Sequence, residues 1–317
     1  MKNYFILFLK GIAMGVANII PGVSGGTIAL ITGIYEELID SLKSFDKTAL
    51  KYLLRFKKKE FVRHTNLNFI LIVFGGSIGV LFLIAYPLEY LLNKHEKLIY
   101  SLFFGLILAS ILSVGRLIKK WNFYTTIAII LGFIIAIIVT NITPSNENNN
   151  LLYIFICGIV SISGMMLPGL SGSHILILLG NYKLIFASTL TGFMKSIKSI
   201  FYSNQDFDYE PLIILSLFCA GSLFGLLSFS RIISWLLKKY KDQTIALLTG
   251  FIIGSLTIIW PWKKIKESIK ISGKEIVTEY DLYFPSSLNI ENLICFLMIL
   301  IGIISIYAIE RYSKVKA

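Results

Sequence analysis

Residues 21–27 read Pro21-Gly22-Val23-Ser24-Gly25-Gly26-Thr27, and about 147 residues later the chain reads Pro168-Gly169-Leu170-Ser171-Gly172-Ser173-His174. When residues 21–35 are laid over residues 168–182, seven of the fifteen positions are identical, including the Pro-Gly-x-Ser-Gly core. An apolar bias alone would not preserve proline, glycine and serine. Weaker matches continue at nearly the same offset, such as Gly105 over Gly250. The chain therefore reads as two halves, residues 1–147 and 148–317, each built from the same kind of unit.

The composition is typical of an integral membrane protein. Of the 317 residues, 56% are hydrophobic, and the mean hydropathy is +0.76, which leaves too little polar surface to cover a globule in water. The apolar runs are about 20 residues long and lack the alternation of barrel strands, so we expect helices. The net charge of +12 comes largely from lysines in loops between these runs, so nucleic acid is not an expected partner. The three cysteines lie far apart inside apolar runs, and no metal or cofactor is expected.

The first half begins with a broken helix pair. A helix over residues 4–20 stops at the Pro-Gly step, and a second short helix follows over residues 24–40. Residues 43–63 are the most basic part of the chain, so the positive-inside rule places them in the cytoplasm, where an amphipathic surface helix could form. Three apolar runs predict spans at residues 67–92, 98–115 and 122–142.

The second half repeats this order. It has a broken pair at residues 151–167 and 173–190. Because the segment 151–167 lies in mid-chain and matches the first helix, the first helix is expected to be retained and not removed as a signal peptide. Spans are predicted near residues 211–235, 243–260 and 291–310.

Loop charges predict the topology. Residues 143–150 carry no basic residue and are expected outside, whereas the basic loops and both termini are expected in the cytoplasm. These loop placements and two cytoplasmic termini are consistent only if the second half is inverted in the membrane relative to the first. The loop 261–290, with five lysines, fits an outside placement poorly. The predicted fold is an all-α polytopic membrane protein with two inverted-topology repeats, each a broken or re-entrant helix pair plus three transmembrane helices.

The two breaks are the expected substrate site. Non-helical backbone at membrane depth is tolerated only where it is buried or lines a cavity, so the breaks should meet near the middle of the membrane. Each new helix begins with a serine cap and free N–H groups, which suit a phosphate. Close helix packing by small residues is the alternative reading, but it does not explain a repeated motif. The predicted substrate-binding residues here are Pro21, Gly22, Ser24, Gly25, Gly26, Thr27, Pro168, Gly169, Ser171, Gly172, Ser173 and His174.

Both motifs, with the residues 28–36 and 175–182 that follow them, are similar to those of the PopT family of polyprenyl-phosphate translocases, formerly a domain of unknown function. The resemblance spans nearly the whole chain. It implies a flippase, not an enzyme, that returns undecaprenyl phosphate to the inner leaflet of the bacterial cytoplasmic membrane. Undecaprenyl phosphate is the lipid carrier of cell-wall polymers such as peptidoglycan. The segments 43–63 and 261–290 are expected to be peripheral to the shared core.

Further residues are candidates for binding or coupling. A phosphate head with roughly −1.5 to −2 charge would move inward against an inside-negative potential, and a coupled proton or cation would remove that load. Glu36, Glu37 and His174 are the candidate carriers, although the two glutamates also fit a solvated helix end and His174 fits an interior histidine. Asn18 could brace the unwound backbone. Arg231 could receive the phosphate as it leaves, or its side chain could reach to the membrane surface.

Two other functions stay open on the residues alone. An integral membrane polyprenyl-diphosphate phosphatase would have similar breaks, but phosphoryl transfer needs a cation clamp. Gly25 and Gly172 stand where its arginine would be expected, so no catalytic residue is assigned. A transporter of a small soluble anion is the second alternative. The residues also leave a homodimer open.

Overall fold

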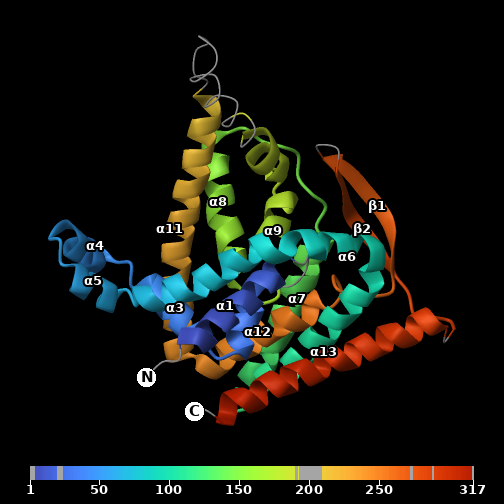
Figure 1. Ribbon diagram of the computed structural model, residues 1–317. Helices are drawn as coiled ribbons and strands as arrows, with labels where there is room; N and C mark the ends of the chain where they lie inside the picture. The colour runs from blue at the N-terminus through green and yellow to red at the C-terminus, as the bar shows by residue number, and fades with distance from the viewer. Residues whose placement is uncertain are drawn as a thin grey trace.

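The chain folds as an assembly of helices with one β-hairpin, as Figure 1 shows. The computed structural model describes residues 4–19, 24–189, 192, 209–271, 274–287 and 289–315. The helices are α1 (Tyr4–Ile19), α2 (Gly25–Ile31), α3 (Tyr35–Lys43), α4 (Lys47–Leu54), α5 (Lys58–His64), α6 (Leu67–Gly115), α7 (Phe123–Asn141), α8 (Leu151–Met166), α9 (Gly172–Leu178), the π-helical η1 (Leu184–Thr189), α11 (Glu210–Lys239), α12 (Lys241–Ser255) and α13 (Ile290–Val315). The strands are β1 (Lys263–Ile271) and β2 (Lys274–Leu282). The predicted all-α class is confirmed, and the hairpin is the exception within the described ranges.

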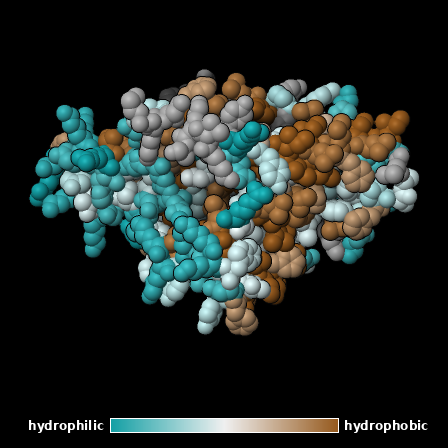
Figure 2. All heavy atoms as spheres, turned by 90° about the horizontal axis from the view of Figure 1, so that it is seen from below, coloured by the Kyte–Doolittle hydropathy of each residue, from teal (hydrophilic) through white to brown (hydrophobic). Residues whose placement is uncertain are grey.

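Four of the described segments are long and apolar enough to cross a membrane. They are Lys94–Gly115, the second part of α6; α7; α11; and Ile290–Ala308 in α13. Figure 2 shows hydrophobic side chains across the centre and right of one face, and hydrophilic side chains on the left, where α4 and α5 lie in Figure 1. The protein is therefore a multi-pass membrane protein.

The predicted boundary inside α6 is present in the structure, whereas α12 differs from the prediction. α6 is two helices joined at a kink, because His95 has non-helical backbone, with φ −136° and ψ 43°. The kink lies within the charged residues 93–97 that were expected to separate the spans 67–92 and 98–115. The predicted span 243–260 is instead the 15-residue α12, which rises about 22 Å and is shorter than the hydrocarbon core of about 30 Å. Most of α12 is buried, and it packs against α6, α7 and α11. It supports the centre of the molecule.

The predicted single helices 24–40 and 173–190 are wrong, because each is interrupted by a glycine. Gly33 has a φ of +72° and Gly180 a φ of +78°, the left-handed conformation that ends a helix. The predicted helix 24–40 is therefore divided into α2 and α3. The predicted helix 173–190 is divided into α9 and the segment that contains η1. The identity of these two glycines in the repeat reflects this shared stop.

Equivalent glycines bring α1 against α6 and α8 against α11. A Cβ atom on Gly11 would overlap the carbonyl of Val73, and one on Gly158 would overlap the carbonyl of Phe218. Gly158 follows Gly11 by 147 positions and Phe218 follows Val73 by 145, close to the offset of the two motifs. Such contacts let helix backbones approach closely, as is usual in membranes.

A second set of glycine contacts crosses between the two halves. A Cβ atom on Gly105 would overlap the carbonyl of Ile299, so the second part of α6 packs closely on α13. Likewise, Gly250 of α12 meets the carbonyl of Ile129 in α7. The last helix of each half thus packs on a middle helix of the other half.

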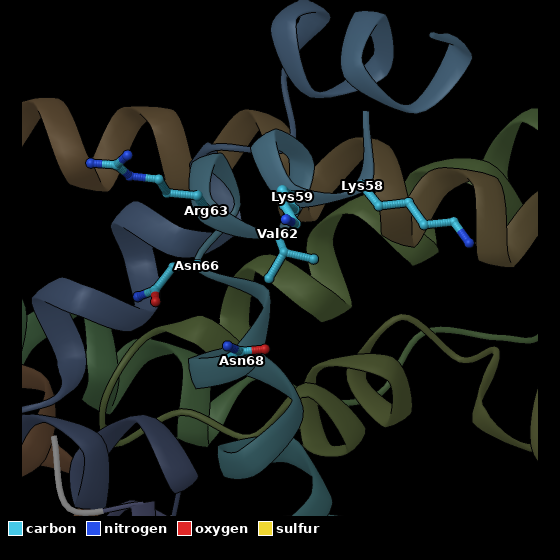
Figure 3. Close-up of a pocket in the computed structure, with 6 residues that line it drawn as sticks. All are labelled: Lys58, Lys59, Val62, Arg63, Asn66 and Asn68. Atoms are coloured by element: carbon cyan, nitrogen blue, oxygen red, sulfur yellow. The ribbon is translucent and has the colours of Figure 1, made fainter. Parts of the chain in front are cut away.

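The basic segment predicted as one surface helix forms two short helices. We call residues 46–64, which contain α4 and α5, the α4–α5 arm. The rings of Phe45 and Phe61 meet edge to face at 6.2 Å, and those of Tyr52 and His64 at 5.8 Å, so the two helices have a small packed interior. An open groove of about 500 Å³ lies where α5 meets the start of α6 (Figure 3).

Asp46 caps α4, and its replacement by alanine is expected to loosen that helix. Partial burial alone would raise its pKa, but hydrogen bonds from the Ala49 amide, His64 and the Thr48 amide lower it below its ordinary 3.8. This carboxylate therefore stabilises the folded arm above pH 3.8, and that contribution is lost as the pH falls through the lower folded pKa. Loss of the cap costs about 1 kcal/mol, so amide exchange at Thr48 and Ala49 should quicken about fivefold at pH 7. Asp46→Asn, which can still cap, should stay near the parental rate; equal rates for Asp46→Ala and the parent would contradict the assignment.

The predicted loop 261–290 is largely a hairpin anchored by tryptophans. The indole N–H of Trp260 donates to the carbonyl of Tyr283 at 3.0 Å. The indole N–H of Trp262 donates to the side-chain oxygen of Asn292 at 2.8 Å, which ties the hairpin base to α13. Trp and Tyr are enriched at membrane surfaces, so this base is suited to an interface.

Candidate functional site

The two helix breaks lie against each other. The Ser24 hydroxyl donates to the carbonyl of Leu167 at 3.3 Å, and the Gly169 amide donates to the Thr27 hydroxyl at 3.0 Å. These bonds join residues 143 and 142 positions apart. The predicted meeting of the two breaks is confirmed.

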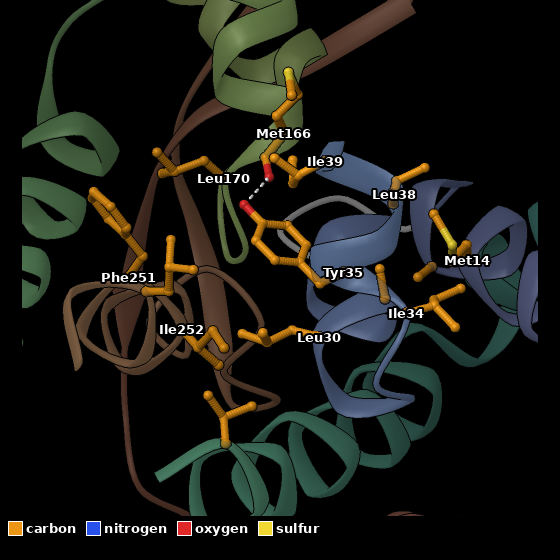
Figure 4. Close-up of a cluster of buried hydrophobic side chains, with 14 of the residues drawn as sticks. Met14, Leu30, Ile34, Tyr35, Leu38, Ile39, Met166, Leu170, Phe251 and Ile252 are labelled. Atoms are coloured by element: carbon orange, nitrogen blue, oxygen red, sulfur yellow. Dashed lines mark hydrogen bonds between the residues drawn. The ribbon is translucent and has the colours of Figure 1, made fainter. Parts of the chain in front are cut away.

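Tyr35 strengthens this junction from α3. Its buried hydroxyl donates to the carbonyl of Met166 at 3.0 Å, the bond dashed in Figure 4. Leu30 of α2 and Leu170 of the second break belong to the same buried apolar cluster as Phe251 of α12. The two breaks and α12 therefore form one packed centre.

The first motif is buried and its polar groups are committed to the junction. Ser24 is 2% exposed and Thr27 is fully buried. The Gly26 amide donates to the Ser24 hydroxyl at 3.1 Å, which caps α2. The side-chain oxygen of Asn18 accepts from the Gly25 amide at 2.7 Å, across the break. These groups brace the backbone, and offering them to a ligand would require breaking existing bonds.

The second motif is more open. The hydroxyls of Ser171 and Ser173 lie 2.8 Å apart; Ser173 is exposed and Ser171 is half-buried. Ser171 makes no side-chain cap bond to α9. His174 Nε2 is buried and has no hydrogen-bond partner within the described part of the chain. Two accessible hydroxyls thus lie within one turn of backbone and can donate to an anion, and the next residue, His174, has a buried Nε2 without a described partner.

The remaining predicted site residues fall in three places. Pro21 and Gly22 lie outside the described residues. Gly172 is buried, with its carbonyl accepting from Ser161 at 3.0 Å. Pro168 lies in the second break, between residues that bond to the first.

Glu36 and Arg231 are placed elsewhere. Glu36 pairs with Lys241 at 2.6 Å, and Arg231 is exposed on α11, where it donates to the carbonyl of Leu227 at 3.3 Å. Within the described ranges, neither is hydrogen-bonded to the two breaks. Their roles in binding stay predictions.

Sequence reasoning missed a polar connection between α3 and the junction of α11 and α12. The Ser234 hydroxyl donates to Asp40 at 2.6 Å, and Lys238 pairs with the same carboxylate at 3.1 Å. With Glu36 and Lys241, these residues form what we call the α3–α11 ion-pair cluster. Acidic residues on α3 and lysines around the end of α11 are visible in the sequence, but no pattern places them side by side.

Comparison with known proteins identifies clear relatives. Residues 14–277 match the family model described as undecaprenyl phosphate translocase-like. The chain is 34% identical to the polyprenyl-phosphate transporter of Vibrio cholerae serotype O1, with 98% of each chain covered. It is 30% identical to the polyprenyl-phosphate transporter of Staphylococcus aureus, over 81% of this chain and 86% of the relative. No solved structure matches the chain.

Proposed function

Because this chain belongs to the undecaprenyl phosphate translocase-like family, and is therefore a transporter and not an enzyme, we propose that its substrate is undecaprenyl phosphate. It moves this lipid from the outer to the inner leaflet of the bacterial cytoplasmic membrane, where the carrier is reused for cell-wall polymers such as peptidoglycan. The names of the two relatives support the polyprenyl phosphate.

The phosphate head binds at Ser171, Ser173 and His174. The observation that carries this assignment is the contrast between the motifs: Ser24 and Thr27 are buried and bonded across the junction, whereas Ser171 and Ser173 are accessible. Hydrogen bonds to an ionised group are roughly twice as strong as neutral ones. An ionised head in hydrocarbon costs many kcal/mol, so sheltering it is the main task of such a site. The prenyl tail stays in lipid.

Two inverted repeats, residues 1–147 and 148–317, supply the moving parts. The equivalent glycine contacts and the shared left-handed stops at Gly33 and Gly180 support this division. Inverted repeats commonly move as bodies around a central site. In this scheme both termini are cytoplasmic, as is the lysine-rich junction of α11 and α12.

Purified protein in proteoliposomes tests the proposal. Labelled undecaprenyl phosphate is placed in one leaflet, and its appearance in the other is followed, with inorganic phosphate uptake as a second arm. Movement of the lipid without phosphate uptake supports the proposal. Phosphate uptake by a folded preparation that leaves the lipid in place would favour a soluble-anion transporter.

The α3–α11 ion-pair cluster must open if the halves rock apart at this end. Asp40→Asn should weaken the closed state, because the carboxylate holds both Ser234 and Lys238. The exposed ion pair contributes little, so about 0.5–1.5 kcal/mol is expected from the hydrogen bonds, or a roughly two- to tenfold rise in open molecules. Spin-label distances between α3 and α11 measure this ratio. Glu291→Gln is the matched control, because it breaks another exposed ion pair, with Lys97 at 3.0 Å, and it should leave the α3–α11 distances unchanged. An unchanged distance distribution in Asp40→Asn would contradict the gating role.

Proton coupling is expected to act through His174. A phosphate moving inward works against about 2.3 kcal/mol per charge per 100 mV, which a proton carried with it would offset. We expect the pH dependence of transport between pH 5 and 8 to flatten in His174→Ala. Glu36→Gln should keep the parental profile, because Glu36 is already paired with Lys241. If His174→Ala retains the parental profile, this histidine is not the carrier.

A further inference from the structure

The α4–α5 arm presents an apolar face that its own packing does not use. Leu50, Leu53 and Leu54 are 54%, 57% and 70% exposed. They recur at the spacing of one helix face, whereas Ala49, at the edge of that face beside Leu53, is 2% exposed. This outer face is therefore not needed to hold the arm together.

Phe56 extends this apolar face at the turn between α4 and α5. It is 86% exposed, and its φ of +54° is in the left-handed region, which is unusual for a bulky side chain. An aromatic ring held in strained backbone and directed into water has no stabilising role in the arm. The same ring would be favourable among lipid acyl chains.

Basic residues border the apolar face. Between residues 47 and 63 the chain has one acidic residue, Glu60, and seven basic residues: Lys47, Lys51, Arg55, Lys57, Lys58, Lys59 and Arg63. Three of them, Lys58, Lys59 and Arg63, line the groove shown in Figure 3, together with Val62, Asn66 and Asn68. None of these three cations forms an ion pair with a described residue. Their charge is therefore available to an external anion.

We propose that the α4–α5 arm docks on the anionic phospholipid surface of the bilayer. Leu50, Leu53, Leu54 and Phe56 insert among the acyl chains, and the basic residues bind headgroup phosphates, with the groove of Figure 3 receiving one of them. The occupant is phospholipid because the excess of basic residues complements anionic headgroups, and because the arm leads directly into the apolar segment Leu67–Val80 of a membrane protein. Apolar area combined with surface charge is the pattern of interfacial helices.

Depth measurements with nitroxide labels test the proposal. Cys219 is the exposed cysteine, whereas Cys157 and Cys295 are buried, so a Cys219→Ala background leaves an introduced cysteine as the reactive one. Labels are placed by Phe56→Cys and, separately, by Leu53→Cys, which keeps the phenylalanine. Thr48→Cys, at an exposed position on another face of α4, is the control. Relaxation by oxygen and by a water-soluble nickel complex is compared in phosphatidylcholine proteoliposomes with and without phosphatidylglycerol, all lacking undecaprenyl phosphate.

In proteoliposomes that contain phosphatidylglycerol, the labels at positions 53 and 56 are expected to lie within the bilayer. The label at position 48 is expected to stay in water. Each basic residue near an anionic surface favours association about fivefold. Lys57→Gln/Lys58→Gln/Lys59→Gln should therefore return most of the immersed label to water, as should 0.5 M salt. Labels 53 and 56 that stay in water with phosphatidylglycerol would overturn the proposal and leave the face for a protein partner. Equal immersion with and without phosphatidylglycerol would overturn the role of charge.

Discussion

Replacing Ser171 and Ser173 together by alanine is expected to reduce undecaprenyl phosphate transport on the order of 100-fold. Each hydroxyl would lose a hydrogen bond to a charged phosphate, worth about 1.5–3 kcal/mol, and each such loss is about tenfold or more. The protein should keep its stability, because these hydroxyls bond to each other and not to the junction of the breaks. Transport is measured in proteoliposomes at equal amounts of folded protein.

Two comparisons separate a binding role from a structural one. Ser216→Ala removes an exposed hydroxyl that bonds only to the carbonyl of Ile213 in its own helix, and it should leave transport unchanged. Ser24→Ala/Thr27→Val should instead lower thermal stability, because it removes bonds between the breaks. A Ser171→Ala/Ser173→Ala variant that transports at the parental rate would move the phosphate site elsewhere.

Gly169→Ala is expected to destabilise the centre of the molecule strongly. Gly169 has a φ of +83°, where an L-residue costs about 1–2 kcal/mol. An added Cβ would also lie 2.6 Å from the carbonyl oxygen of Phe251, and such overpacking costs about 1–3 kcal/mol. The total loss of about 2–5 kcal/mol should appear as a large fall in the unfolding midpoint in detergent.

Gly33→Ala is the matched control for this prediction. Gly33 has a similar φ of +72°, but a Cβ there would meet nothing within 4 Å. Its variant should therefore show only the backbone cost, about 1–2 kcal/mol. If both variants lower the midpoint equally, the chain around Phe251 moves away without cost, and α12 does not support the second break as rigidly as its packing indicates.

The features predicted best from sequence depend on local backbone chemistry. The Pro-Gly-x-Ser-Gly steps do break helices, because proline and glycine act within a few residues. The same signal was present at Gly33 and Gly180, which were matched in the repeat, but their role as helix stops was not recognised. The alternating residues of 263–271 likewise indicated a strand that was not predicted.

The site could be predicted only as a set of candidates. Sequence identity makes Ser24 and Ser171 look equivalent, yet one is buried in the junction and the other is half-buried beside Ser173. That difference depends on which carbonyls and amides face each motif across more than 140 residues of chain. The α3–α11 ion-pair cluster was missed for the same reason, because the Asp40–Lys238 pairing exists only after the halves have packed.

The last helix of each half, α7 or α13, packs on a helix of the other half, and this affects how the protein is made. α7 leaves the ribosome about 100 residues before its partner α12, and the second part of α6 precedes α13 by about 175 residues. At about 5–20 residues per second, α7 remains without its partner in the membrane for about 5–20 s. Its close-packing face, centred on Gly132, is exposed during that time to lipids and to other nascent chains. Each half can form its own internal contacts, α1 on α6 and α8 on α11, as it is made. The contacts of α7 with α12 and of α6 with α13 form only after the second half has been synthesised.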